Sequence, residues 1–306
     1  MTSIRDLAPY SPIVTRPPIT WPNGARLALW IVPNIEFYEF DPPPAVGRET
    51  WDRVPSYPDV REYSFRDYGN RVGLWRMLDL LDEFQVRATV SLNIALLDHF
   101  PEIGEVIVDR GWAVMSHGLY NTRFLYGMTE EEEREFYRDN IDSLARLTGL
   151  RLKGILTPAV TNTPRTPALI AEAGLVYHAD WVHDDQPAPI LVPSGRLISM
   201  PYSYDLNDAP LWDGRPYSGD YLVDVCRRQF DRLYAEGEAN GMVMCVALHP
   251  YQIGQPHHAE VLREMLDYLC GRDDVWYATG DEIAEYYLQN YYDLHVEHAR
   301  EVADAG

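Results

Sequence analysis

GMVMCVALHPY, at residues 241–251, contains the clearest buried strand of this chain. The apolar run from Met242 to Leu248 is too short for a buried helix and shows no polar alternation, which is typical of a strand covered on both faces in a parallel sheet. His249 follows directly, where the strand ends. In barrels and doubly wound sheets, ligands bind at the carboxyl ends of the strands. We therefore expect His249 to lie at a functional edge.

Strand and helix patterns alternate along the rest of the chain, without a change in composition or a linker. This alternation predicts an α/β fold: one distorted (β/α) barrel domain of about seven parallel strands with outer helices. We expect an extended, proline-rich N-terminal arm at 1–24, the barrel at 25–292 and a surface tail at 293–306. The expected strands are 26–32, 87–92, 112–116, 154–156, 176–179, 196–200, 242–248 and 275–277, and the expected helices are 68–84, 95–110, 129–148, 164–173, 220–238, 260–270 and 281–289.

The composition limits the partners and the compartment. The 306 residues carry a formal net charge of −21, which argues against nucleic acid or a membrane surface and favours a small-molecule substrate. The three cysteines form no paired pattern, which indicates a reducing compartment. Because no leader segment or long apolar run is visible, we expect a cytoplasmic protein. We also expect a homo-oligomer, a dimer or a tetramer, to which the N-terminal arm could contribute.

Two common cofactor motifs are missing from the sequence. No GxGxxG follows an expected strand, and no GxxxxGK[ST] phosphate loop occurs. A dinucleotide cofactor and a phosphate-loop nucleotide site are therefore not expected.

Polar side chains gather at the ends of the expected strands, whereas the strand interiors stay apolar. Glu36, His117, Asp180 and His249 lie at four of these ends and are the candidate catalytic residues. A single histidine at a strand end is more often a hydrogen-bonded structural residue. Two histidines and two acids at one barrel edge favour a catalytic role.

A second group of residues near the same ends is assigned to substrate binding. The aromatic members suit a pocket for a flat polar molecule, although ordinary packing at a barrel rim explains them equally well. Asp184 could also belong to a charged surface turn. The candidates are Asn34, Asn121, Arg123, Trp181, Asp184, Tyr202 and Tyr251.

Five segments in order resemble one family. They read IVPNIE at 31–36, RDYGNRVG at 66–73, SHGLYNTR at 116–123, ADWVHDDQP at 179–187 and LHP at 248–250. Together they resemble the polysaccharide deacetylase (NodB-homology) superfamily, and most of all its intracellular branch, which is similar to the metal-independent allantoinase. The likeness covers roughly residues 10 to 290 and implies the distorted barrel of the NodB-homology type.

The resemblance also bears on a metal. Deacetylases of this family hold a divalent metal with an acidic pair after the first strand and a His-x-x-x-His after the third. The matching residues here make Glu36, His117 and Asn121 the metal triad, and an amide is a weak ligand for zinc. Asn34 also cannot serve as the general base that the family's first aspartate provides. We therefore expect no cofactor, with zinc at Glu36 and His117 as the alternative.

The activity that the resemblance implies is hydrolysis of a non-peptide carbon–nitrogen bond in a small amide, cyclic amide or ureide. Glu36 or Asp180 would activate water, while His117 and His249 would polarise the carbonyl or protonate the leaving nitrogen. Two alternatives stay open. One is a metal-dependent deacetylase of a small acetylated amine, and the other is an inactive barrel that binds a ligand or a partner.

Overall fold

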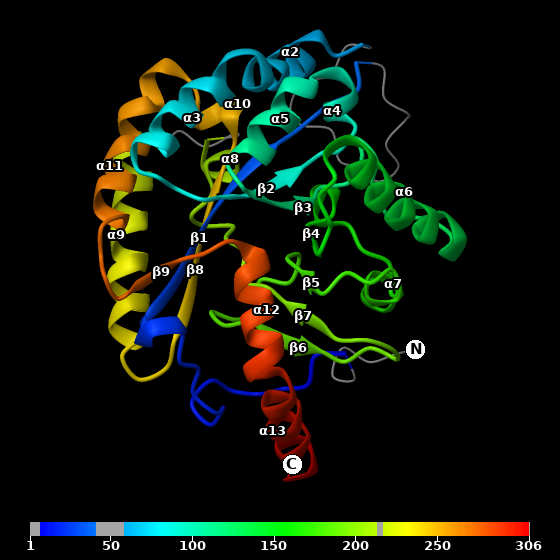
Figure 1. Cartoon of the computed structure of the whole chain (residues 1–306), viewed down its shortest axis with the longest axis vertical. Coiled ribbons are helices and arrows are strands. Elements are labelled where there is room, and N and C mark those ends of the chain that lie inside the picture. The colour runs from blue at the N-terminus through cyan, green and yellow to red at the C-terminus, as the bar shows by residue number, and fades with distance from the viewer. Residues whose placement is uncertain (1–6, 41–57, 213–216, 306) are drawn as a thin grey trace.

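The computed structural model describes residues 7–40, 58–212 and 217–305. Its centre is a nine-stranded sheet in the order β6-β7-β5-β4-β3-β2-β1-β8, with β9 also paired to β1. The sheet is mostly parallel and curls into a half-barrel with helices around it, as Figure 1 shows. The predicted α/β barrel fold is therefore confirmed.

Strand β1, Leu27–Ile35, is the hub of the sheet. It pairs in parallel with β8, Met242–Leu248, along its length, and with β9 at Leu27–Leu29 and β2 at Asn34–Ile35. The prediction that β1 ends before Pro33 is wrong: Pro33 lies within the strand, opposite Leu248. The remaining strands are β2 Thr89–Leu92, β3 Ala113–Ser116, β4 Gly154–Ile155, β5 Tyr177–His178, β6 Ala188–Ile190, β7 Leu197–Ser199 and β9 Val275–Tyr277.

Strand β6 was not expected from the sequence. It runs antiparallel to β7, whereas the other pairings of the sheet are parallel. Three residues are too few to show the alternation of apolar and polar side chains that predicts a strand. Pairing with the neighbouring β7 orders this segment.

Helices flank the curled sheet on both sides. The predicted helix at 129–148 begins with a capping box between Thr129 and Glu132 and ends at Gly149, whose φ of 75° suits a glycine. The predicted helix at 95–110 is broken at Phe100, before Pro101. The helices are α2 Val60–Tyr68, α3 Leu74–Glu83, α4 Leu96–His99, α5 Pro101–Asp109, α6 Glu130–Thr148, α7 Thr166–Glu172, α8 Asp208–Trp212, α9 Gly219–Glu236, α10 Pro250–Ile253, α11 Ala259–Leu269, α12 Gly280–Asn290 and α13 Tyr292–Ala305, with a π-helix, η2, at Gly69–Gly73 and short 3-10 turns η1 Pro22–Gly24, η3 Pro158–Val160 and η4 Pro256–His258.

The prediction of a surface tail at 293–306 is also wrong. Helix α13 covers most of it, and His295 is fully buried. The His295 ring donates from Nε2 to the carbonyl of Pro17 at 2.9 Å and accepts the Tyr287 hydroxyl at Nδ1, at 2.8 Å. The N-terminal arm and α13 consequently lie at the same end of the molecule, opposite α2 (Figure 1).

The two faces of β1 belong to different hydrophobic clusters. Leu27, Leu29 and Ile31 pack with residues of α3, α9 and α11. Ala28, Trp30 and Val32 pack with residues of α12 and the arm. Because side chains alternate along a strand, Asn34 and Glu36 continue the register of this second face.

The same register holds in the neighbouring strands. Met115 of β3 and Ala247 of β8 belong to the second cluster, so His117 and His249 follow on that face as well. The sheet therefore directs these side chains toward one region at the ends of β1, β3 and β8.

No helix in the described residues is both long and apolar enough to cross a membrane.

Candidate active site

Glu36 lies at the centre of the candidate site, directly after β1, with 7% of its surface exposed. Its Oε1 lies 3.7 Å from His117 Nε2 and 3.5 Å from His249 Nε2. Burial alone would raise the pKa of Glu36, but the contact with His249 and the nearby His117 and Arg66 outweigh it and lower the pKa to about 2. Glu36 is therefore a carboxylate held between two imidazoles.

The first imidazole, His117, is kept neutral. Its Nδ1–H donates to the carbonyl of Leu156 at 2.8 Å, so the neutral ring carries its lone pair on Nε2, toward Glu36. Burial lowers the pKa of His117 below its ordinary value, although Glu36 opposes this shift. His117 is thus a base with its lone pair directed into the site.

The second imidazole, His249, is kept protonated. Burial would lower its pKa, but Asp208 and Glu36 raise it to about 10. The His249 Nδ1–H donates to Asp208 Oδ1 at 2.7 Å. Nε2–H then points to Glu36, which makes His249 a cationic donor at neutral pH.

Asp208 is a site residue that sequence reasoning missed. It opens the short helix α8, is completely buried, and accepts hydrogen bonds from the backbone N–H groups of His249 and Ile253 as well as from the His249 ring. It lies in the irregular stretch 202–219, where no periodic pattern marks it. The sequence around Asp208 also contains Asp205, and nothing in the local pattern indicates which of the two acids is buried.

Backbone packing between two glycine-containing segments positions His249. The π-helix η2 crosses α10 so closely that a Cβ at Gly73 would overlap the carbonyl oxygen of Pro250. At Gly69 a Cβ would lie 2.8 Å from the backbone nitrogen of Tyr251. Asn70, between these glycines, donates to the backbone carbonyl of Glu36 at 3.0 Å. The GNRVG segment therefore joins the ends of β1 and β8.

Asn34 and Asn121 belong to the segments next to Glu36: Asn34 precedes it by two residues in β1, and the Asn121 backbone N–H donates to the carbonyl of Phe37 at 3.1 Å. Asn34 Nδ2 donates to the carbonyls of Val32 and Leu248, and its Oδ1 accepts the Tyr202 hydroxyl at 3.2 Å. Asn121 Nδ2 donates to the Tyr38 hydroxyl at 2.5 Å. Two buried oxygens, Asn121 Oδ1 and Glu36 Oε2, accept no hydrogen bond in the described structure.

Asp180 is buried, but its acceptors are already used. Its carboxylate accepts hydrogen bonds from the backbone and hydroxyl of Thr157 and from Asn162 Nδ2, and His178 Nε2 lies 2.8 Å away. Burial would raise its pKa, but His178 and Thr157 lower it below the ordinary value. This arrangement suits a residue that positions the loop after β5 more than one that takes a proton from water.

The other predicted binding residues fall into two groups: Tyr251 and Trp181 are packed against other aromatic rings, and Arg123 and Asp184 form ion pairs within the protein. Tyr251 is buried, with its ring 5.3 Å from the His249 ring, and Trp181 packs against the core near His178. Arg123 forms an exposed ion pair with Glu39 at 2.8 Å. Asp184 pairs with Arg16 of the arm at 2.5 Å. Arg123 and Asp184 were predicted to bind substrate. In the structure their charged groups pair with Glu39 and Arg16 instead.

A further cation that the prediction omitted lies near Glu36. Arg66 of α2 lies over the rings of Tyr38 and Tyr251, at 5.2 and 4.8 Å, and its Nη1 donates to Glu62 at 2.8 Å. Its charge contributes to the lowered pKa of Glu36. Arg66 belongs to the RDYGNRVG segment, so the family resemblance contained this signal.

A cavity of about 460 Å³ opens behind Tyr202. It is bounded by the segments 182–185 and 201–205, by Gln229 and by Val243 and Cys245 of β8. Because the Tyr202 hydroxyl bonds Asn34, this cavity shares a wall with the candidate site.

The donors at the site suit a divalent metal poorly. Glu36 and His117 are its two strong ligands, with the amide Asn121 as the third. No group of three His, Cys, Asp or Glu side chains in the described ranges is arranged to hold a metal ion. The imidazolium of His249 already lies where a cation would balance Glu36. The residues present therefore do not fit a divalent metal.

Comparisons with known proteins agree with the sequence resemblance. A family model described as polysaccharide deacetylase matches residues 63–178. The crystal structure of the Puue allantoinase superposes with a TM-score of 0.79 and 26% identity, covering 90% of this chain and 95% of that one. Residues 63–178 thus match the polysaccharide deacetylase family, and over most of its length the chain is similar to proteins of that superfamily.

Two further proteins named as polysaccharide deacetylases align with almost the whole chain. A probable polysaccharide deacetylase from Pseudomonas aeruginosa PAO1 gives a TM-score of 0.76 at 27% identity, over 90% of this chain and 95% of that one. A Schizosaccharomyces pombe protein, provisionally named a polysaccharide deacetylase, is 25% identical over 93% of this chain and 97% of its own length. The polysaccharide deacetylases are carbon–nitrogen hydrolases, and these similarities support an enzyme of this class.

Proposed function

We propose that the chain hydrolyses a non-peptide carbon–nitrogen bond in a small amide, cyclic amide or ureide, and that Glu36, His117 and His249 carry out the reaction without a metal. The observation that carries the proposal is the placement of one carboxylate between a neutral and a protonated imidazole. A base and an acid in one site are what hydrolysis of an amide needs.

His117 is the general base in this proposal. A water molecule between His117 Nε2 and the free Glu36 Oε2 gives its proton to Nε2 as its oxygen forms a bond with the carbonyl carbon. The charge of Glu36 stabilises the imidazolium that forms. Asp180 does not fill this role, because Thr157 and Asn162 already occupy its oxygens.

His249 is the general acid. Its Nε2–H first faces the oxygen that gains negative charge, and it then protonates the leaving nitrogen as the carbon–nitrogen bond breaks. Asp208 holds the ring and keeps it protonated until that step. After bond cleavage His117 carries an extra proton and His249 lacks one, and proton exchange with solvent returns both residues to their starting states before the next turnover.

The unpartnered oxygens support a substrate with N–H groups. Asn121 Oδ1 is a buried acceptor on the segment whose backbone bonds Phe37, the residue after Glu36, and a buried acceptor without a donor is costly. An amide or ureide N–H would satisfy it. Tyr202 and Asn34 hold each other in place and would line the same space.

The test is a screen of amides, cyclic amides and ureides with the full chain, followed by a pH profile of kcat/KM. We expect activity to need neutral His117, with an acidic limb below pH 6.5, and to fall near pH 10 as His249 loses its proton. Glu36→Gln and His249→Gln are each expected to lower kcat by roughly 10² to 10⁴-fold. The control is Arg196→Gln, which lies in an exposed ion pair with Asp293.

Two results would contradict this assignment. A profile without an acidic limb would rule out neutral His117 as the base, and one that does not fall near pH 10 would rule out protonated His249 as the acid. Loss of activity with a chelator, restored by zinc, would favour the metal-dependent deacetylase. If Glu36→Gln and His249→Gln bind ligand normally and the wild type shows no hydrolysis, the barrel is a binding protein.

The proposal also covers the setting of the reaction. The three cysteines are free, two of them buried, which supports a reducing compartment such as the cytoplasm. The predicted homo-oligomer stays a prediction that a mass measurement in solution can check.

A further inference from the structure

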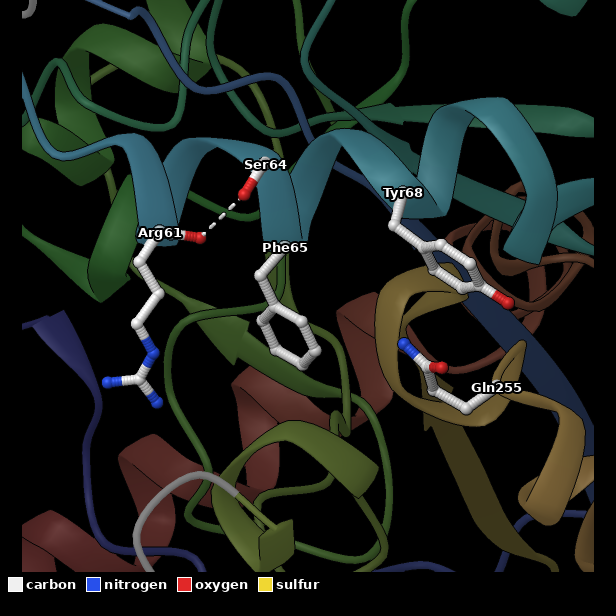
Figure 2. A pocket seen from close by; sticks show the side chains of 5 residues that line it. All are labelled: Arg61, Ser64, Phe65, Tyr68 and Gln255. Carbon is white, nitrogen blue, oxygen red and sulfur yellow. Dashed lines mark hydrogen bonds between the residues drawn. The ribbon is translucent and has the colours of Figure 1, made fainter.

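A second cavity, of about 390 Å³, lies beside helix α2, and Glu36 is not among the residues that line it. Arg61, Ser64, Phe65 and Tyr68 line it from one face of α2, and Gln255 lines it from the loop after α10. Figure 2 shows the Arg61 and Phe65 side chains extending from the same side of the helix, with Tyr68 and Gln255 close together at the other end. Cavities of a few hundred Å³ are typical of small-ligand sites.

Among the residues that the structure describes, the lining of this cavity is rich in donors and contains no acid. The Arg61 guanidinium makes no ion pair within the part of the chain that the structure describes, although the protein carries a net charge of −21. The Tyr68 hydroxyl accepts a hydrogen bond from Arg76 Nη1 at 2.9 Å, which leaves its own proton free to donate. Gln255 Nε2 uses one proton on the carbonyl of Tyr251, at 3.1 Å, and keeps a second.

The aromatic part of the lining gives the cavity a flat wall. Phe65 and Tyr68 lie one turn apart on α2, so both rings face the same space. A flat ring can stack on them, and a negative group on that ring can reach Arg61.

Phe65 also connects this cavity to the candidate active site. Its ring lies 5.4 Å from the ring of Tyr251, which lies 5.3 Å from the ring of His249. The neighbouring residue on α2, Arg66, lies over Tyr251 and lowers the pKa of Glu36. The two sites therefore share a wall of side chains.

We propose that the cavity of Arg61, Phe65, Tyr68 and Gln255 binds a carboxylate carried on a flat ring. Arg61 pairs with the carboxylate and the ring lies on Phe65, while Tyr68 and Gln255, at the other end of the lining, offer hydrogen-bond donors to the far edge of the ligand. The ligand is either the remote end of a substrate or a separate molecule. Binding here needs no hydrolysis, so it can be tested independently of the proposed reaction.

The experiment titrates the full chain with benzoate and, separately, with benzamide, using calorimetry or ligand-observed NMR. Benzoate should bind, and neutral benzamide of the same shape should bind roughly tenfold more weakly or not at all. Arg61→Gln should weaken benzoate roughly tenfold, whereas Tyr68→Phe, at the other end of the lining, should change its affinity little. Arg151→Gln is the matched control, because Arg151 is an exposed arginine outside the cavity.

Equal binding of benzoate and benzamide would overturn the proposal, and so would an Arg61→Gln affinity equal to that of the wild type. An equal loss in Arg61→Gln and Arg151→Gln would also overturn it, since that reports only the change in net charge. Where hydrolysis is measurable, competitive inhibition by benzoate assigns the site to the substrate's remote end. Inhibition that leaves KM unchanged assigns it to a separate ligand.

Discussion

The two histidines at Glu36 differ in what their Nδ1 atoms meet. His117 donates from Nδ1 to a neutral carbonyl, that of Leu156, and stays unprotonated at Nε2. His249 donates from Nδ1 to a carboxylate, that of Asp208, and keeps both protons. The hydrogen-bond partner of Nδ1 therefore decides the role of each ring: the Leu156 carbonyl leaves His117 a base, and the Asp208 carboxylate makes His249 an acid.

At the residue scale, the His249–Asp208 pair predicts how stability depends on pH. The pKa of His249 rises from 6.5 to about 10 on folding, so its stabilising contribution is complete below pH 6.5 and is lost as pH rises toward 10. We expect the free energy of unfolding to fall across this window by up to about 1.4 kcal/mol per pH unit from this group. Urea unfolding at a series of pH values measures it.

His249→Gln serves as the reference for this measurement, because it removes the titrating ring. The difference in unfolding free energy between wild type and His249→Gln should shrink between pH 6.5 and 9, before most tyrosines and cysteines ionise. Asp208→Asn should reduce the dependence, since it takes away the charge that raises the pKa. A difference that stays constant with pH would show that His249 is not protonated by folding.

At the element scale, the crossing of η2 and α10 sets the position of His249. Gly73 and Gly254 let the two backbones meet at the Pro250 carbonyl, where a Cβ on either glycine would overlap that oxygen. His249 immediately precedes α10, so a shift of this helix moves the imidazole relative to Glu36. Glycine here is a requirement of close packing, since a side chain would separate the two segments.

Gly73→Ala should destabilise the protein by about 1 to 3 kcal/mol, because the new methyl group forces η2 and α10 apart. Thermal and urea unfolding measure the loss, and kcat should fall with it. Gly104→Ala in α5 is the control: its Cβ would meet Leu97 at an ordinary 3.5 Å, so it should be neutral or slightly stabilising. If the two variants were equally stable, the close crossing would not hold in solution.

At the scale of the whole molecule, the N-terminal arm and helix α13 bond to the barrel and to each other. Trp21 of the arm is buried and donates to the carbonyl of Met242 at 2.8 Å. Arg16 reaches Asp184 and Gln186 in the loop after β5. His295 of α13 then bonds the arm at Pro17. The arm is thus part of the core and not only a cover.

Arg16→Leu should cost about 3 kcal/mol of stability, because it leaves Asp184 without its partner in a mostly buried place. The side chains of this pair are 4% and 15% exposed. Arg196→Leu breaks the pair with Asp293, whose side chains are 50% and 74% exposed, and should cost less than about 1 kcal/mol. Chemical unfolding compares the two, and similar losses would mean that burial does not govern the Arg16 pair.

Much of the barrel could be predicted because its signals are local. The run Met242–Leu248, the strand Val275–Tyr277 and the capping box at Thr129 lie where their residue types indicate. Short elements escaped prediction: α8, α10 and β6 span too few residues for a period, and their neighbours order them.

The sequence by itself determined which side chains share a face at the barrel edge. Period-two alternation from β1, β3 and β8 directs Glu36, His117 and His249 to one side, and the motifs around them carry the family resemblance. These features depend on residue type and spacing along one strand.

Only the tertiary structure decided what each of these groups does. Asp208 bonds His249 across 41 residues of sequence, and Leu156 bonds His117 across 39. Arg16 pairs with Asp184 across 168 residues. Protonation depends on burial and on charges a few ångströms distant in space, which residue order along the chain does not encode locally. The curl of the sheet brings those groups together.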